Sequence, residues 1–268
     1  MNSSNKQLTK LLSAVFVTLI YIFLYLPIAI IVFFSFNSSK LNIVFQGFTL
    51  QWYGVMLQNT DLMSALENTA IVASATVVIS VFIGTLAAIG MFRYEFRGKS
   101  IVDSFLYIPI VIPEIVMGIS LLAFYHILNI SLGITTLIIA HVTFSMPYVV
   151  VTVRSRIAGY DMSVEEAAMD LGATRLRTLL RITLPIIAPG ILAGAMLALT
   201  LSLDDVIVSF FTTGVDSMTL PIYIFNKVKT GVSPDINALV TVIILITLLI
   251  LVFMRTFEAK TSKKGQVG

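Results

Sequence analysis

The sequence predicts an all-α, polytopic membrane protein with six transmembrane helices. Of its 268 residues, 57% are hydrophobic and 12% are charged, and the mean hydropathy is +0.98. A soluble domain carries about 25% charged residues, so lipid is the solvent for much of this chain. The charged residues also leave uncharged windows long enough to cross a bilayer, and Lys and Arg are distributed unequally between the segments that join them.

The lengths of the uncharged windows set the number of spans. A helix needs about 20 apolar residues to cross roughly 30 Å of hydrocarbon. The window between Glu114 and Arg154 contains 39 residues, so it holds parts of two helices, and Asn129, Ser131 and Gly133 separate them. The predicted spans are 11–36, 68–92, 101–128, 134–156, 186–211 and 236–256, within one transmembrane domain, 1–268.

The distribution of Lys and Arg predicts the orientation. If the N-terminus is cytoplasmic, 14 of these residues lie in cytoplasmic segments and only Lys40, Lys227 and Lys229 lie outside. Cytoplasmic loops carry the excess of positive charge in membrane proteins. We therefore expect both termini inside, in a bacterial plasma membrane, and a first apolar run that is retained as a span because it is too long for a signal peptide.

The composition also argues against several functions. Without cysteine there is no disulfide framework or thiolate metal site, and His126 and His141 cannot build a histidine-rich metal site by themselves. The sequence contains no G-x-x-x-x-G-K-[ST] motif, so we expect no ATP-binding site in this chain. The net charge of +3 reflects membrane topology, and no nucleic-acid partner is expected.

The polar segment 157–185 carries the clearest local signals. Ser163 and Glu166 are spaced as a capping box at a helix start, and Gly172 is placed to end that helix in the left-handed conformation. Thr174 can cap a second helix, which Pro185 is expected to stop. The pair either docks against a soluble partner or rests on lipid headgroups, and its residue chemistry alone leaves both open.

Three acids lie in or near the predicted spans. Glu114 is at the midpoint of the third span, next to Pro113, where an acid costs roughly 2.5–3.5 kcal/mol and usually faces a water-filled cavity or a partner. Asp204 and Asp205 follow a stripe of small residues near the outer end of the fifth span, and they point in different directions on a helix. With no matching intramembrane Lys or Arg, they indicate a cationic substrate; ordinary pairing or solvation is the alternative.

The motif in the polar segment 157–185 resembles that of a known family. The spacing Glu166-Ala167-Ala168, three residues, Gly172, nine residues, Ile182-x-Leu184-Pro185 resembles the EAA signature of ABC-importer permeases. The resemblance implies an ABC type I importer permease fold. It also implies that Glu166, Ala167, Ala168 and Gly172 lie on a coupling helix that sits in a cleft of a cytoplasmic ATPase.

Much of the remaining chain, from about residue 20 to 240, is similar to PotC-type permeases of spermidine/putrescine importers. The matching stretches include Pro113 to Met117 and Leu201 to Ser209, although Glu114 stands where Asp is expected in that subfamily. The resemblance implies a PotB-like permease partner, a PotA-like ATPase dimer that binds ATP and Mg²⁺, and a PotD-like extracytoplasmic polyamine-binding protein. It places Glu114, Asp204 and Asp205 along the substrate pathway.

Two alternatives stay open at this point. One is an ABC permease for another small cationic solute, because related permeases share much of the framework. The other is a secondary transporter that uses Glu114 and a histidine as a proton relay, which would leave the EAA loop unexplained. An intramembrane enzyme is disfavoured, because the sequence lacks H-E-x-x-H, G-x-S-x-G and cysteine.

Overall fold

The computed structural model describes residues 3–40, 44–231 and 233–264, and side chains for residues 10–40, 44–229, 231 and 233–249. Within these ranges the chain is helical and contains no strand beyond an isolated bridge between Asn37 and Phe48. The contacts divide it into two units, Met1–Met63 with Asn226–Gly268, and Ser64–Phe225. Helices α3 (Thr60–Arg93) and α11 (Leu220–Thr230) contribute to both.

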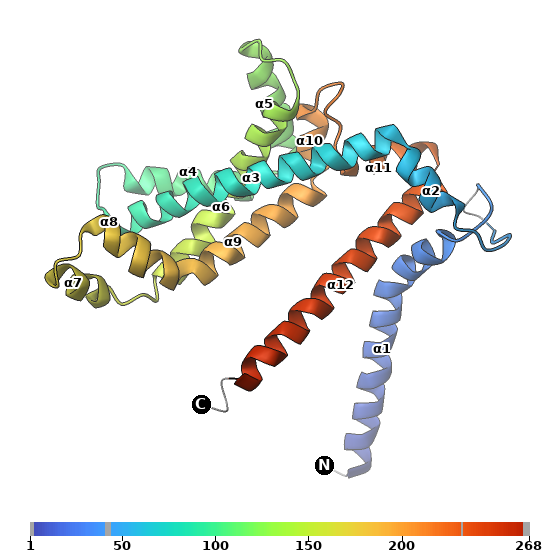
Figure 1. The fold of residues 1–268 in the computed structure, drawn as a ribbon, viewed down its shortest axis with the longest axis horizontal. Coiled ribbons are helices and arrows are strands. Elements are labelled where there is room, and N and C mark those ends of the chain that lie inside the picture. Colours follow the sequence, from blue (N-terminus) through green and yellow to red (C-terminus); the bar gives the residue numbers. More distant parts are fainter. Residues whose placement is uncertain (1–2, 41–43, 232, 265–268) are drawn as a thin grey trace. The chain divides into compact units, whose positions relative to one another are not determined.

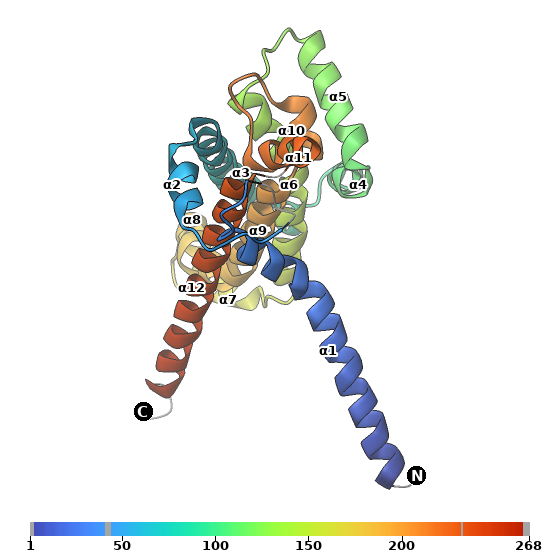
Figure 2. The same cartoon turned by 90° about the vertical axis from the view of Figure 1, so that its right-hand side faces the viewer.

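The first unit contains the long helices α1 (Ser3–Phe34) and α12 (Pro234–Lys264) and the short helix α2 (Gln51–Gln58). Helix α12 packs against both α1 and α2, and Asn59 Nδ2 donates a hydrogen bond to Asp235 Oδ2 at 2.9 Å. The start of α1 and the end of α12 lie at the same end of this unit (Figures 1 and 2). This arrangement agrees with the predicted orientation, and the side of the membrane that these helix ends face stays a prediction.

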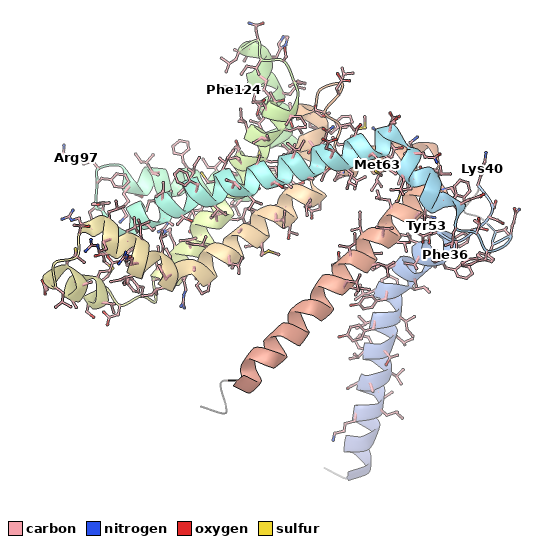
Figure 3. The ribbon with its side chains drawn as sticks, in the orientation of Figure 1. Phe36, Lys40, Tyr53, Met63, Arg97 and Phe124 are labelled. Carbon is pink, nitrogen blue, oxygen red and sulfur yellow. The ribbon has the colours of Figure 1, made fainter. Side chains whose placement is uncertain are left out.

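Aromatic packing fixes the turn between α1 and α2. The Phe36 ring stacks on Phe48, with centroids 5.3 Å apart, and also contacts Tyr53 (Figure 3). The buried Trp52 indole Nε1 donates to the carbonyl of Asn37 at 2.6 Å, and Asn37 Nδ2 donates to the carbonyl of Val44. These contacts satisfy backbone groups that a loop would otherwise leave unpaired.

The second unit is built around α6 (Ile134–Ile157) and α9 (Leu184–Asp204), which lie side by side (Figure 1). Their shared apolar core includes Val149, Val153, Ile187 and Ala198, all fully buried. The small-residue stripe predicted on the fifth span lies in this contact: Gly190, Gly194 and Ala198 are buried. Small residues let two backbones approach closely where lipid provides no hydrophobic driving force.

This close approach gives a stability prediction for Gly190→Ala. A Cβ at Gly190 would lie 2.6 Å from Arg156 Cβ, whereas a Cβ at Gly90, in α3, would meet nothing within 4 Å. Overpacking a helix contact costs about 1–3 kcal/mol, whereas Gly→Ala in an open helical position is neutral or stabilising by up to about 1 kcal/mol. Gly190→Ala should lower the melting temperature of the purified complex, and the control Gly90→Ala should not. Equal melting temperatures for both variants would contradict the packing.

The third predicted span differs from the structure. In place of one kinked helix there are two helices, α4 (Lys99–Val111) and α5 (Glu114–Ile127), which meet at an angle of 110° (Figure 2). The cause is local, because proline disfavours helical geometry in the residue before it. Ile112, which precedes Pro113, is extended, with φ −68° and ψ 133°.

The fifth predicted span is also corrected at both ends. Pro185 does not stop the second loop helix: α8 (Arg175–Thr178) runs through a π-helical turn, η1 (Leu179–Thr183), directly into α9. Proline fits the first turn of a helix, and the wider π turn accommodates its missing N–H. At the other end α9 stops at Asp204, and a separate helix, α10 (Ile207–Thr212), follows and packs against α5 and α6.

Four described helical segments are long and apolar enough to cross a membrane, and α4 with α5 makes a fifth if the bent pair is one span. The apolar part of α12, Pro234–Leu249, is shorter within the described side chains. This count is compatible with the six predicted spans.

Candidate functional site

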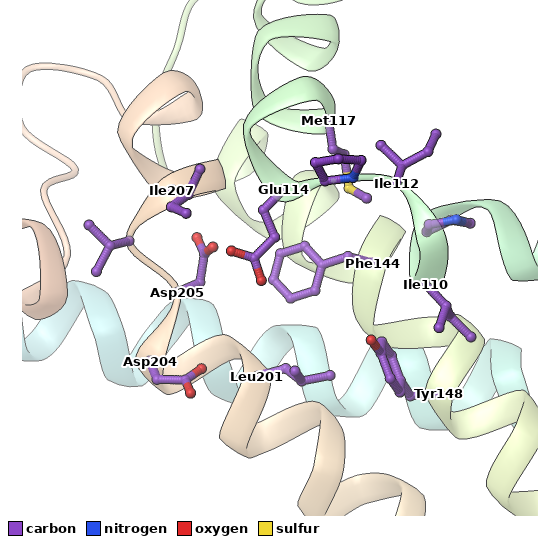
Figure 4. A pocket seen from close by; sticks show the side chains of 13 residues that line it. Ile110, Ile112, Glu114, Met117, Phe144, Tyr148, Leu201, Asp204, Asp205 and Ile207 are labelled. Atoms are coloured by element: carbon purple, nitrogen blue, oxygen red, sulfur yellow. The ribbon is translucent and has the colours of Figure 1, made fainter.

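The three acids predicted on the pathway line one cavity in the second unit. It has a volume of about 490 Å³ and lies where α4 gives way to α5 and where α9 gives way to α10. Figure 4 shows the carboxyl groups of Glu114 and Asp205 turned toward one another, with Phe144 beside them. Its lining residues are Pro109, Ile110, Ile112, Pro113, Glu114, Met117, Phe144, Tyr148, Leu201, Asp204, Asp205, Val206 and Ile207.

Glu114 reaches this cavity because a helix begins there. Pro113 precedes α5, and Glu114 is the first residue of its first turn. A carboxylate at this position is stabilised by the partial positive charge of the helix N-terminus. The Glu114 side chain is exposed to the cavity rather than buried among helices.

Asp204 and Asp205 occupy different environments, as the sequence predicted, although the cause is a helix break rather than a continuing helix. Asp204 ends α9 and is exposed. Asp205 is 8% exposed, and its two carboxylate oxygens accept hydrogen bonds from the amides of Val208 and Ser209 at 3.2 and 2.7 Å. Asp205 therefore caps α10, and Asp204 and Glu114 are the acids with free carboxylate surface.

The electrostatics of this cavity favour a cation. The lining contains three acids and no Lys, Arg or His. Leu201 and Asp204, in the last turn of α9, line the cavity, and the roughly half negative charge of that helix C-terminus offsets the half positive charge of the α5 N-terminus at Glu114. The amides that start α10 are already bonded to Asp205, so they do not offset the charge of the α9 C-terminus. Phe144 and Tyr148 add aromatic rings, which attract cations on their faces.

The two histidines have different surroundings. His141 is a hydrogen-bonded packing residue: it is 1% exposed and contacts the hydroxyls of Ser202 and Ser209 at 2.7 and 2.8 Å. His126 is exposed near the end of α5. In the described ranges, no three His, Asp or Glu side chains converge to hold a metal ion.

The loop 157–185 folds into two short helices, α7 (Ser163–Asp170) and α8. Gly172 has the predicted positive φ, +90°, and Thr174 Oγ1 accepts a hydrogen bond from the Arg177 amide, so both signals are confirmed. The predicted capping box is wrong, because Ser163 starts α7 and its amide donates to Asp161 Oδ1 at 3.0 Å. That hydrogen bond holds the pKa of Asp161 below its ordinary value.

An ion pair that sequence reasoning missed anchors α7. Glu165 is 3% exposed, and both of its carboxylate oxygens lie 2.6 Å from an Arg93 guanidinium nitrogen at the end of α3. The Thr183 hydroxyl also donates to Glu165, at 2.6 Å. The partners are 72 and 18 residues away in sequence, so no local pattern could have indicated this pairing. A second missed pair joins Asp103 of α4 to Arg154 of α6.

Beside this anchor, α7 exposes part of its surface within the described chain. Glu166 and Ala167 are exposed, Ala168 is half-buried, and the turn that follows exposes Gly172. Leu171 is 91% exposed, a large apolar side chain at the tip of a polar loop. An anchored helix with a small, apolar-edged outer face is suited to contact with another surface.

The fold and the site define a multi-pass membrane transport protein, with an acidic cavity at two helix breaks and an anchored helix pair outside the spans. Residues 80–263 match the family described as binding-protein-dependent transport system inner membrane component, and the chain belongs to this family. It is therefore a translocation subunit rather than an enzyme.

Relatives extend over nearly the whole chain. The spermidine/putrescine transport system permease protein PotC of Escherichia coli (strain K12) is 42% identical over 259 residues, 97% of this chain and 98% of the relative. PotC of Haemophilus influenzae is 41% identical over 92% of this chain and 96% of its own length. The putrescine transport system permease protein PotI of Escherichia coli (strain K12) is 41% identical, covering 84% and 82%.

Solved structures confirm the fold. A chain of a bacterial ABC transporter involved in the import of the acidic polysaccharide alginate superposes with a TM-score of 0.73 over 97% of this chain and 98% of that one, at 15% identity. The resemblance to the ABC-importer permease fold is thereby confirmed.

Proposed function

We propose that this chain is the permease subunit of an ATP-driven importer that moves spermidine or putrescine into the cytoplasm. The observation that carries the proposal is the cavity, whose lining combines Glu114, Asp204 and Asp205 with two aromatic rings and no basic side chain. The permeases PotC and PotI, named for spermidine/putrescine and putrescine transport, support the same cargo. The fold also serves an importer of an acidic polysaccharide, so the fold does not choose the cargo.

In this proposal Glu114 and Asp204 receive the ammonium groups as a polyamine loses its hydration shell. Carboxylates, helix C-terminal carbonyls and aromatic faces replace the lost water contacts. Asp205 is committed to α10 and acts by shaping the cavity. Passage follows an alternating-access cycle, in which the cavity opens to one side of the membrane at a time.

The proposed partners follow from the surfaces this chain leaves free. Glu166, Ala167, Ala168 and Gly172 contact a PotA-like ATPase dimer, which binds the ATP and Mg²⁺; this chain needs no cofactor of its own. A PotB-like second permease covers part of α1, whose apolar segment Lys10–Phe34 is not buried within the described chain. A PotD-like binding protein delivers the polyamine on the extracytoplasmic side. Both termini are cytoplasmic.

The test is uptake of labelled spermidine in proteoliposomes that contain this chain with its partner permease, ATPase and binding protein. We expect saturable, ATP-dependent uptake that Gly172→Val removes, because a β-branched residue is strained at φ +90°. Gly172→Asn is the matched control, since asparagine tolerates this region. Binding-protein-stimulated ATP hydrolysis without polyamine uptake would reject the cargo but keep the transporter class. Uptake without the ATPase would reject the proposal in favour of a secondary transporter.

A further inference from the structure

A chain of buried hydrogen bonds links three helices behind the cavity. His141 of α6 contacts Ser202 of α9 through Nδ1, at 2.7 Å, and Ser209 of α10 through Nε2, at 2.8 Å. The Ser209 hydroxyl donates to Asp205 Oδ2 at 2.6 Å, and His141 Nε2 lies 3.5 Å from the same oxygen. All four side chains are buried, and His141 also packs against the Phe144 ring.

The numbers of donors and acceptors on these side chains determine which group donates in each of these hydrogen bonds. The single hydroxyl proton of Ser209 is donated to Asp205, so Ser209 must accept from His141 Nε2–H. In a neutral imidazole the other nitrogen is then an acceptor, and Ser202 donates to Nδ1. The neutral Nε2–H tautomer of His141 therefore satisfies every member of this hydrogen-bond chain.

The His141 ring connects the two helices on either side of the break at the cavity. Ser202 lies before the break between α9 and α10, and Ser209 lies after it, so His141 holds both sides of the interruption that opens the cavity. The same contacts keep Asp205 turned toward α10. A buried, fully satisfied polar network fixes one geometry, because each alternative leaves an unpaired group.

We infer that His141 is a positioning residue for polyamine passage: as the neutral Nε2–H tautomer it holds α10 and Asp205 in place, so that Asp204 and Glu114 present their carboxylates to the cavity. This inference rests on the proposed function for the cargo, but the geometry that it assigns to His141 does not.

Two substitutions of His141 distinguish the role of its Nε2 atom from that of its Nδ1 atom. The amide of glutamine reaches the place of Nε2 and can donate to Ser209, whereas the amide of asparagine reaches only the place of Nδ1. In the reconstituted complex, His141→Gln should keep uptake within about twofold, and His141→Asn should lower it about tenfold, the usual size of one lost buried hydrogen bond. Ser145→Ala is the control, because Ser145 lies one turn along α6 and its buried hydroxyl has no partner in the described chain.

Ser209→Ala tests the same link without disturbing the space of the ring. It should reduce uptake at least as much as His141→Asn, because it also removes the hydrogen bond from the Ser209 hydroxyl to Asp205. The double variant should be no worse than Ser209→Ala, because both changes break the same link between His141 and Ser209. Additive losses would overturn the inference, as would equal uptake by His141→Gln and His141→Asn. If His141→Asn does not assemble, Ser209→Ala alone decides, and wild-type uptake by it overturns the inference.

A readout without substrate distinguishes this inference from the proposed function. The chain has no cysteine, so Val206→Cys places a single thiol in the cavity lining, at the break itself. We expect His141→Asn to change its rate of labelling by a cationic thiol reagent severalfold, and His141→Gln to leave that rate unchanged. If wild-type complexes fail to move polyamines but the labelling follows this order, the cargo is wrong and the positioning role stands. Identical labelling in both backgrounds overturns the positioning role.

Discussion

Glu114→Gln is expected to lower polyamine uptake at least tenfold while the complex assembles normally. The substitution keeps the size of the side chain and removes its charge, in a cavity whose lining contains no basic residue to compensate. Two unit charges 4 Å apart attract by about 4 kcal/mol at an effective dielectric constant of 20, so losing even part of one contact exceeds a factor of ten. The measurement is initial uptake of labelled spermidine per assembled complex.

Glu95→Gln is the matched control, because the Glu95 side chain is exposed and pairs with Lys99 four residues away. Such surface pairs contribute little. Asp204→Asn should resemble Glu114→Gln, with reduced uptake and unchanged stability. Asp205→Asn should instead lower the melting temperature, since one of two capping oxygens is replaced by a donor. Normal uptake by Glu114→Gln would remove the carboxylate from the proposed pathway.

The contrast between the acids shows what the sequence could predict about the cavity. The apolar windows predicted the helices, and their lack of basic residues predicted a cationic cargo. The geometry that brings the three carboxylates to one cavity was not predictable from the residues, because it depends on two helix breaks. The break at Ile112 has a readable local cause in Pro113. The break at Asp205 does not, since its stabilising partners are the first amides of a helix that exists only after the break.

The loop 157–185 divides in the same way. Gly172 and Thr174 act through their own backbone and nearest neighbours, so their roles were predicted correctly. Ser163 was misassigned because Asp161, two residues earlier, takes the amide that the capping box required to be free. Pro185 was misassigned because the π turn before it accommodates the missing N–H of the proline, so the helix continues. Glu165 was missed because its partner, Arg93, belongs to another helix.

Glu165→Leu is also expected to have a large effect: the loss of uptake that is coupled to the ATPase. The change leaves the Arg93 guanidinium, 19% exposed, without its carboxylate, and it removes the side-chain hydrogen bonds that hold α7 to α3 and to η1. Breaking a buried pair by removing one partner costs on the order of 3 kcal/mol. Because α7 carries the proposed coupling residues Glu166 and Ala167, a displaced α7 cannot meet the ATPase in register. Uptake and binding-protein-stimulated ATP hydrolysis should both fall at least tenfold.

The double variant Arg93→Met with Glu165→Leu distinguishes anchoring from direct contact with the ATPase. Replacing both partners of a buried pair by apolar groups is often nearly neutral, because no charge is left without a partner. If Glu165 only anchors α7, the double variant should recover assembly and most of the uptake that Glu165→Leu loses. If it is no better than the single variant, Glu165 contributes to the ATPase contact itself, and the anchoring role is wrong.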